Sequence, residues 1–340
     1  MADADQDRLR DFVAQFRVDA GSKVRLGRDF DPAATAGVEE SEAEDLLREG
    51  VEDLSKLQER LAAQDTQALL VIIQAIDAAG KDGTIRHVMS GVNPQGVNVT
   101  SFKVPSDEEN DHDFMWRYHK ALPARGMIGI FNRSYYEELL VVRVHPAILQ
   151  GQKLPPDRKN DGIWNRRFKQ INDWESYLVD QGTTIVKLFL NLSKDEQRQR
   201  FIDRIDEPDK NWKFSAGDVK ERAYWDDYQR AFEAVLSKSS TKAAPWYVIP
   251  ADHKWFARIA AAGILAHTLR EMDPAFPTVD PAARDELLAM RALLVAEDAG
   301  ATSAGATADA TTDASVTPAA TGKAKASSKA KAKGKRAKGG

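Results

Sequence analysis

The hydrophobic positions of the chain form two patterns that alternate along most of its length. Short runs that are apolar on both faces are typical of strands covered by helices on each side. These runs lie at 69–73, 126–131, 183–192 and 246–250, and 96–104 alternates or runs apolar as a further strand. Segments with helical spacing separate them. The alternation predicts an α/β fold, a parallel sheet with helices on both faces.

The helical segments have apolar residues three and four positions apart, with charged residues between them. We expect helices at 38–64, 84–89, 107–122, 163–180, 193–205, 219–238 and 254–271. The start of one is marked by a capping-box signature, in which Ser193 takes the N-cap and Glu196 follows three residues later.

The chain divides into three regions by composition. We expect an N-terminal extension at 1–36, a main α/β domain at 37–294 in which about 194–222 forms a lid, and a tail at 295–340. The tail is rich in Ala, Thr and Lys and has too few large apolar residues to form a core, so we expect it to be disordered. Its basic residues can contact polyanions by charge, or the tail can serve only to solubilise the chain.

Composition narrows the chemistry. The 340 residues include no cysteine, which excludes disulfides, thiolate catalysis and zinc–thiolate sites. The acidic, polar start lacks the features of a secretory signal, and no apolar stretch reaches spanning length. We therefore expect a cytoplasmic protein with no membrane partner.

The first apolar run ends in a small turn that is typical of a phosphate loop. Ala78, Ala79 and Gly80 let backbone N–H groups approach an anion, and Lys81 adds a mobile positive charge. Asp82, Gly83 and Thr84 come next in the chain. They lead into a helix whose N-terminus would favour phosphate. The usual pattern GxxxxGK[ST] is not met in full, because Ala75 replaces its first glycine and Asp82 its hydroxyl.

Asp77 lies inside this loop, where its charge would repel a phosphate unless a cation lay between them. Magnesium would remove the conflict, and we expect Asp77 to direct it. The alternative is that Asp77 or Asp82 only caps the following helix.

Polar residues also follow the other strands at the edge where ligands of open parallel sheets bind. Lys103 follows the second strand, and Asn132, Arg133 and Ser134 follow the third. Arg133 and Glu137 are four residues apart, so an internal salt bridge is the alternative to a functional pair.

Five cations follow the fourth strand and suit a mobile lid that closes over several phosphates. They are Arg198, Arg200, Arg204, Lys210 and Lys213. The alternative is a solvated helix face, because Arg200 and Arg204 share one face in either case.

Together these segments resemble the polyphosphate kinase 2 family from about Lys23 to about Leu269. The matching pieces are IDAAGKDGT, FKVPS, HDFMWRYHK, GIFNRSYYEELLVVRVH, LNLSKDEQRQRFIDR, WKFSAGD, YWDDY and APWYVIPADHKW. The resemblance implies a thymidylate kinase-like, P-loop kinase-like fold, Mg²⁺ as cofactor, and inorganic polyphosphate and nucleotides as substrates. It also makes a homodimer or homotetramer plausible. The FNRS form resembles the subgroup that accepts both AMP and ADP.

The function we expect is magnesium-dependent transfer of the terminal phosphoryl group of polyphosphate to nucleoside mono- or diphosphates. Catalytic roles are expected for Asp77, Lys81, Asn132, Arg133, Glu137, Arg200 and Arg204. Phosphate binding is expected for Ala78, Ala79, Gly80, Asp82, Gly83, Thr84, Lys103, Arg198, Lys210 and Lys213. The alternatives are an ATP-dependent nucleoside monophosphate kinase and a non-catalytic polyphosphate or nucleic-acid binding protein.

Overall fold

The structure is a computed structural model that describes residues 2–305. The chain divides into a first unit that ends at Pro277 and a second unit that begins at Thr278. The second unit contributes one described helix, α14 (Pro281–Gly305), which the sequence patterns did not predict. Its start has a physical signal, because Pro281 occupies the first turn and Asp280 Oδ1 accepts a hydrogen bond from the Ala283 N–H at 2.8 Å.

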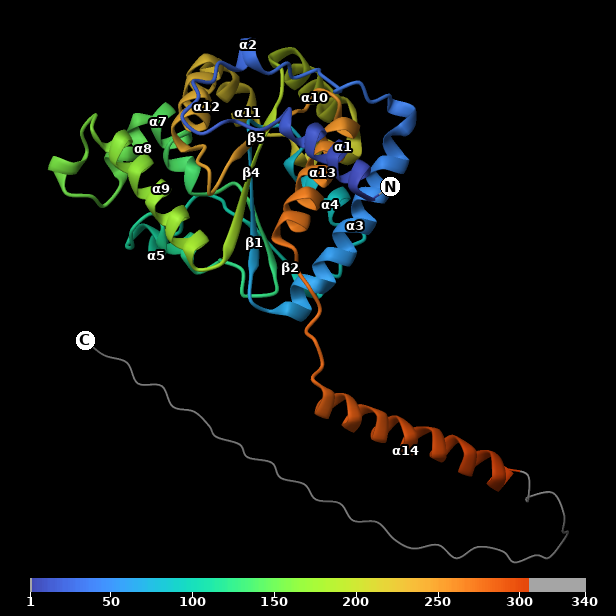
Figure 1. Ribbon diagram of the computed structural model, residues 1–340. Coiled ribbons are helices and arrows are strands. Elements are labelled where there is room, and N and C mark those ends of the chain that lie inside the picture. Colours follow the sequence, from blue (N-terminus) through green and yellow to red (C-terminus); the bar gives the residue numbers. More distant parts are fainter. Residues whose placement is uncertain (1, 306–340) are drawn as a thin grey trace, which may run out of the picture. The chain divides into compact units, whose positions relative to one another are not determined.

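The first unit is built on a five-stranded parallel sheet in the order β2-β3-β1-β4-β5 (Figure 1). The strands are β1 (Ala68–Ala75), β2 (Val97–Ser101), β3 (Ile128–Asn132), β4 (Thr183–Asn191) and β5 (Trp246–Pro250). All four neighbouring pairs are parallel, which confirms the predicted α/β class. Strands β1 and β3 inside the sheet and β5 at its edge are buried throughout, as their apolar runs predict.

Helices and short 3₁₀ segments connect and cover the strands. The α-helices of the first unit are α1 (Ala2–Ala14), α2 (Leu26–Asp29), α3 (Ala43–Gln64), α4 (Lys81–Val88), α5 (Asp107–Asn110), α6 (Trp116–His119), α7 (Val141–Val144), α8 (Pro146–Gly151), α9 (Ile163–Asp180), α10 (Lys194–Asp206), α11 (Ala216–Glu221), α12 (Trp225–Ser239) and α13 (Lys254–Met272). The 3₁₀ segments are η1 (Glu40–Glu42), η2 (Pro94–Gly96), η3 (Tyr135–Glu138), η4 (Pro156–Arg158), η5 (Pro208–Lys213) and η6 (Arg222–Tyr224).

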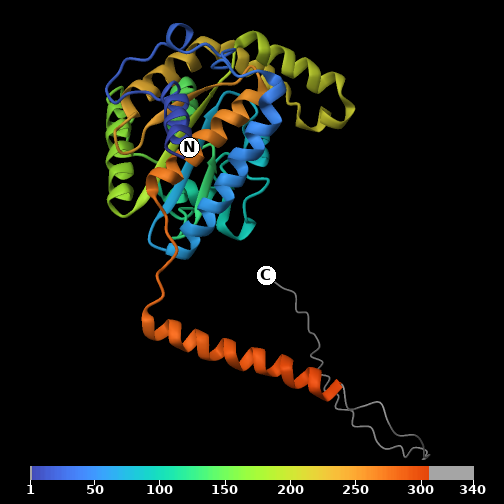
Figure 2. The same ribbon diagram turned by 45° about the vertical axis from the view of Figure 1, so that its right-hand side comes forward.

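The sheet separates two hydrophobic cores. Leu69 and Val71 of β1 face a core that includes residues of α3 and α13, whereas Leu70 and Ile72 face a core that includes residues of α9 and α12. Figures 1 and 2 show these two pairs of helices on opposite faces of the sheet. The alternation along β1 therefore sends successive side chains to opposite layers.

Two regions depart from the predicted elements. The helix expected at 107–122 is two short helices, α5 and α6, and a capping box at Ser106 and Glu109 begins the first of them. The tail expected to be disordered from residue 295 is helical to Gly305, and its remainder lies outside the described residues. The extension at 1–36 belongs to the first unit, where α1 packs on α13.

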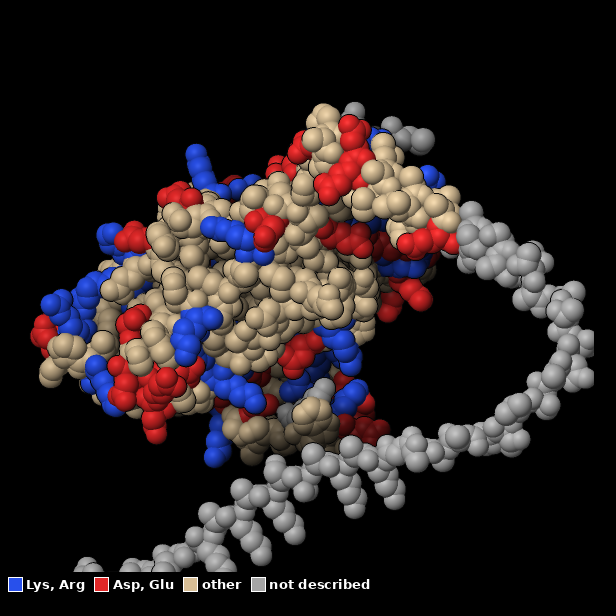
Figure 3. All heavy atoms as spheres, turned by 90° about the horizontal axis from the view of Figure 1, so that it is seen from below, with Lys and Arg blue, Asp and Glu red and all other residues tan. Residues whose placement is uncertain are grey.

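The edge at which β1 begins carries charges of both signs. Viewed from below, lysine, arginine, aspartate and glutamate side chains are interspersed around a broad area without charged residues (Figure 3). Such a mixed surface does not favour a polyanion. The opposite edge, where the strands end, holds the candidate site.

Candidate active site

The phosphate loop lies between β1 and α4 and has a strained backbone. Gly80 (φ 102°) and Ala78 (φ 65°) both adopt left-handed conformations. Glycine does so freely, but an alanine in this region stores strain that surrounding contacts must hold.

Arg200 supplies those contacts from α10. Its Nη1 donates to the carbonyl oxygens of Ala78 (3.1 Å) and Ala79 (3.0 Å). Its Nη2 donates to the carbonyls of Ala251 and Asp252, which follow β5. The side chain is only 3% exposed. This corrects the expectation that Arg200 is a mobile lid cation beside Arg204: Arg200 fastens the phosphate loop to the end of the sheet.

Lys81 also differs from the expected mobile charge. Its Nζ donates to the carbonyl oxygens of Ala75 (3.0 Å) and Ile76 (3.1 Å), so the ammonium group is held at the end of β1. Burial lowers its pKa to about 8, and the positive charge of Arg133 acts in the same direction. Lys81 is therefore a cation whose charge is sensitive to mildly alkaline pH.

Arg133 links the phosphate loop to the end of β3. Its Nη2 donates to Asp77 Oδ1 at 2.7 Å, and its Nη1 donates to Glu137 Oε2 at 3.3 Å. The internal salt bridge considered as an alternative is thus present, and it lies at the ligand-binding edge. Arg133 itself adopts φ 65°, and its N–H donates to the Ile73 carbonyl.

Asn132 contacts the residue in the hydroxyl position of the phosphate-loop pattern. Its Nδ2 donates to Asp82 Oδ1 at 2.6 Å. The N-cap of α4 is Gly80, and no side-chain hydrogen bond caps this fully described helix. The capping alternative for Asp77 and Asp82 is therefore wrong.

The predicted lid cations have different surroundings. Arg204 lies 4.0 Å from Asp218, and burial raises the pKa of the Asp218 carboxyl, with the charge of Asp77 adding to the effect. Arg198 and Lys210 are instead paired within their own helical turns, with Asp195 and Glu207. Nothing is described of the Lys213 side chain.

A cavity of about 500 Å³ collects most of these groups. Its lining is Asp77, Ala78, Gly80, Lys81, Asp82, Gly83, Ser101, Phe102, Lys103, Asn132, Arg133, Arg204, Trp212 and Asp218. Thr84, expected to bind phosphate, is instead buried inside α4, where its N–H donates to the Gly80 carbonyl. Asp218 and Trp212 were not among the expected site residues, although both lie in the matching piece WKFSAGD, because neither residue type indicates a role by its spacing.

A smaller recess lies beside the cavity, and the two share Asp77 and Arg133. Trp225, Tyr228, Glu221 and Arg222 contribute to its other walls. Sequence reasoning missed these residues as site components, because they belong to the predicted helix 219–238, where aromatic residues pack in most proteins.

The oxygen donors of the cavity fit magnesium. Among the described residues, no group of three or more acidic or histidine side chains could hold a metal ion by itself. Mg²⁺ does not need such a group, because one or two carboxylates plus substrate phosphates and water normally complete its shell. Asp77 and Asp82 supply carboxylates at the phosphate loop, as such a site requires.

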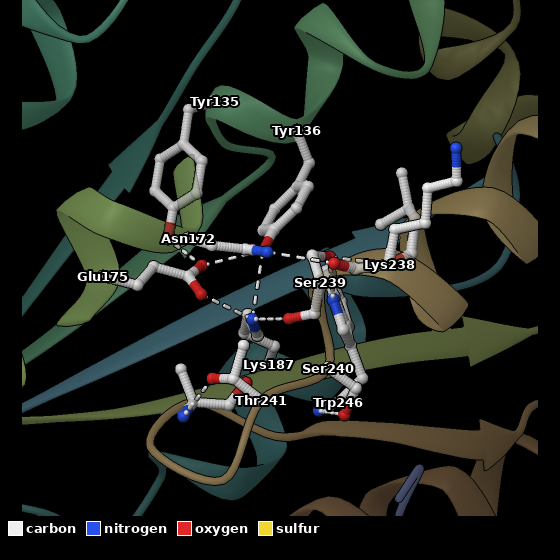
Figure 4. A network of polar contacts seen from close by, with 12 residues as sticks. Tyr135, Tyr136, Asn172, Glu175, Lys187, Lys238, Ser239, Ser240, Thr241 and Trp246 are labelled. Carbon is white, nitrogen blue, oxygen red and sulfur yellow. Dashed lines mark hydrogen bonds and ion pairs between the residues drawn. The ribbon is translucent and has the colours of Figure 1, made fainter. Parts of the chain in front are cut away.

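A buried polar network includes residues of η3, the turn that follows Arg133 in the chain. Lys187 Nζ donates to Glu175 Oε2 at 2.6 Å and to the Ser239 carbonyl at 2.6 Å (Figure 4). The hydroxyls of Tyr135 and Tyr136, which follow Arg133 closely in η3, both donate to Glu175 Oε1. The network thus ties the turn after β3 to β4, α9 and the end of α12.

Comparison with known proteins gives the family. The model of polyphosphate kinase 2 matches residues 37–277. The chain belongs to the polyphosphate kinase 2 family. The resemblance found in the motifs is therefore confirmed, and with it the P-loop kinase-like fold and the enzyme class, a kinase.

Relatives of the family match over nearly their full length. An ADP-polyphosphate phosphotransferase of Rhodopseudomonas palustris is 52% identical over 286 residues, covering 83% of this chain and 98% of the relative. An AMP/ADP-polyphosphate phosphotransferase of Meiothermus ruber is 44% identical over 272 residues, covering 79% of this chain and 97% of the relative. The crystal structure of polyphosphate kinase 2 from Arthrobacter aurescens TC1 matches with a TM-score of 0.73 and 43% identity, covering 80% of this chain and 95% of that chain.

Proposed function

We propose that the protein transfers the terminal phosphoryl group of inorganic polyphosphate to a nucleoside diphosphate or monophosphate, with Mg²⁺ and in a reversible reaction. The observation that carries the proposal is the cavity at the carboxyl edge of the sheet, where a phosphate loop, four cations and two loop carboxylates meet. The cations are Lys81, Lys103, Arg133 and Arg204. The printed names of the relatives support the same donor and acceptor classes.

No protein nucleophile is needed for this reaction. Phosphoryl transfer through a loose transition state depends on alignment and on neutralising the charge of the phosphate oxygens. Lys81 is fixed at the end of β1, and Arg133 is fixed by two carboxylates, so both charges are oriented before substrate arrives. Arg204 of α10 lines the same cavity and adds a further positive charge.

Asp77 has two roles in this proposal. Without substrate it holds Arg133 at 2.7 Å, and with substrate it would help to hold Mg²⁺ while Arg133 turns to a phosphate. Held there, Mg²⁺ would supply charge neutralisation for the phosphate oxygens. Glu137 keeps Arg133 oriented through the exchange.

We propose that the acceptor range includes both AMP and ADP. Neutral Asn132 stands at the end of β3, where a carboxylate would add repulsion against a polyphosphate end that meets acceptors of different length. The alternative is that Asn132 acts only through its hydrogen bonds. Measuring kcat/KM for AMP and ADP in the wild type and in Asn132→Asp separates them, because an unchanged ratio would remove Asn132 from acceptor choice.

Incubation with Mg²⁺, long-chain polyphosphate and either ADP or AMP tests the reaction. We expect ATP from ADP and ADP from AMP, and no product with Lys81→Ala. Phosphorylation of AMP by ATP without polyphosphate would instead support a conventional nucleoside monophosphate kinase. Polyphosphate binding without turnover would support a binding protein.

We further propose a cytoplasmic homo-oligomer. Among the described residues, no helix has the length and apolar character needed to cross a bilayer. Light scattering after size-exclusion chromatography tests the oligomeric state, and a monomeric mass at micromolar concentration would contradict it.

A further inference from the structure

The cavity contains two loop carboxylates in different electrostatic surroundings. Asp77 accepts a hydrogen bond from the cationic Arg133. Asp82 accepts one from the neutral amide of Asn132 at 2.6 Å, and no lysine or arginine in the described part of the chain forms a salt bridge with it. Asp82 is thus the loop acid without a salt bridge among the described residues, although the charge of the neighbouring Lys81 acts on it.

An exposed aspartate needs no cation, but Asp82 lines a cavity whose other groups fit polyanions. Phosphate oxygens entering that cavity would meet its negative charge directly, and close charges of like sign repel each other. A divalent cation between them converts repulsion into attraction.

The local structure keeps Asp82 available for this role. It lies in the first turn of α4, where the helix dipole attracts negative charge. It does not cap the helix, whose N-cap is Gly80. The amide of Asn132 binds Oδ1 and leaves Oδ2 for another ligand.

We propose that Asp82 is the second carboxylate that directs Mg²⁺ at this site, beside Asp77, and that Asn132 orients it. The end of β3 carries the neutral Asn132 in place of a carboxylate. The carboxylate of Asp82, in the first turn of α4, accepts a 2.6 Å hydrogen bond from Asn132 and supplies the negative charge instead. This inference rests on the proposed polyphosphate-dependent function, and it identifies Asp82 as part of the metal site.

Reciprocal exchange of the pair tests the inference. Mn²⁺ serves as the probe, and its dissociation constant is measured by electron paramagnetic resonance in saturating ADP without polyphosphate, where no turnover occurs. We expect Asp82→Asn to weaken Mn²⁺ affinity by at least about tenfold. The double variant Asp82→Asn/Asn132→Asp keeps one carboxylate and one amide, and we expect it to recover to within about threefold of the wild type.

Asp218→Asn is the matched control, because it removes the same charge from the same cavity at a side chain that Arg204 already approaches. We expect less than about threefold loss there. Equal losses in Asp218→Asn and Asp82→Asn, or no loss in Asp82→Asn, would overturn the inference. Thermal melting of each variant separates misfolding from loss of the metal.

These results are distinguishable from failure of the proposed function. A wild-type protein that forms ATP from ADP and polyphosphate, together with an Asp82→Asn variant of normal Mn²⁺ affinity, would refute the role of Asp82 and leave the reaction intact. A wild-type protein without turnover would refute the reaction itself.

Discussion

Two ion pairs near the turn after β3 have nearly equal N–O distances, but they differ in solvent exposure and in the number of their hydrogen-bond partners. The Lys187–Glu175 pair has an N–O distance of 2.6 Å, and its side chains are 0% and 1% exposed. The Arg133–Asp77 pair has a distance of 2.7 Å, and its side chains are 35% and 32% exposed. Distance alone therefore does not separate a structural pair from a functional one.

The difference lies in how completely each pair is surrounded by polar partners. Glu175 accepts hydrogen bonds from Lys187, Tyr135 and Tyr136, and Lys187 also donates to the Ser239 carbonyl. Buried charges require such satisfaction, and a fully satisfied network holds one arrangement. Asp77 and Arg133 keep access to the cavity, so each can exchange its partner for a ligand.

The largest effect is expected from breaking the buried pair. Lys187→Met leaves the buried Glu175 without its cation, and we expect a loss of about 3–5 kcal/mol in the free energy of unfolding. Urea denaturation of the purified protein measures it. Adding Glu175→Gln removes the uncompensated charge and keeps an acceptor for the two tyrosines, so the double variant should regain part of the loss. Equal stability of Lys187→Met and wild type would contradict the structural role.

For the half-buried Arg133–Asp77 pair we expect a large effect on activity and a small effect on stability. Asp77→Asn keeps the shape of the side chain and leaves the folded state within about 1 kcal/mol of the wild type. We expect its kcat to fall by about 100-fold or more, because the variant lacks a carboxylate for Mg²⁺. Activity assays over a range of Mg²⁺ concentration measure this. Normal kcat with an unchanged Mg²⁺ requirement would contradict the metal role of Asp77.

The site also contains a charge that responds to pH. The pKa of Lys81 is about 8, below its ordinary value, because burial penalises the charged form. Raising the pH through 8 removes this charge from the free protein, so polyphosphate affinity should fall by up to about tenfold per pH unit above it. The stability of the folded protein should change in the opposite direction. It should rise as the pH rises from 8 toward 10.5, because loss of the proton from Lys81 removes the unfavourable burial of its charge.

Binding of polyphosphate in the absence of nucleotide, measured between pH 7 and 10, checks the effect. Lys81→Arg is the control, because a guanidinium stays charged throughout this range. A parallel decline in both proteins would show that another group titrates.

Sequence patterns predicted the residues at the carboxyl edge of the sheet better than those of the buried Lys187–Glu175 network. Leu69–Ile73 must be a central strand because it is apolar on both faces, and parallel strands end at one edge, which places Asp77, Arg133 and Lys103 together. Lys187 interrupts the otherwise apolar run of β4, and nothing local reveals that its partner is Glu175 of α9.

Arg200 is a second residue whose partners cannot be predicted from the sequence. Its spacing from Arg204 correctly indicates a shared helix, but its partners are carbonyls of Ala78 and Asp252, which are remote in sequence. Only the folded chain shows that Arg200 holds the phosphate loop. The α14 helix was missed for a different reason: its large residues Leu287, Leu294 and Val295 are exposed, so it lacks the buried face on which helix prediction depends.

The smallest effect is expected from removing the second unit, which contributes no described residue to the cavity or to the Lys187 network. A chain that ends at Pro277 should keep kcat within about twofold and the free energy of unfolding within about 0.5 kcal/mol. The end of the chain beyond residue 305 is rich in lysine, and residues 297–340 carry eight Lys or Arg against four Asp or Glu. If those lysines attract polyphosphate, the truncated chain will show a higher KM for polyphosphate at low ionic strength and an equal KM at high ionic strength, because salt screens exposed charges. Steady-state assays at both ionic strengths measure this. Loss of kcat on truncation would mean that turnover depends on the tail, and that the two ion-pair systems of the first unit do not contain all the determinants of the reaction.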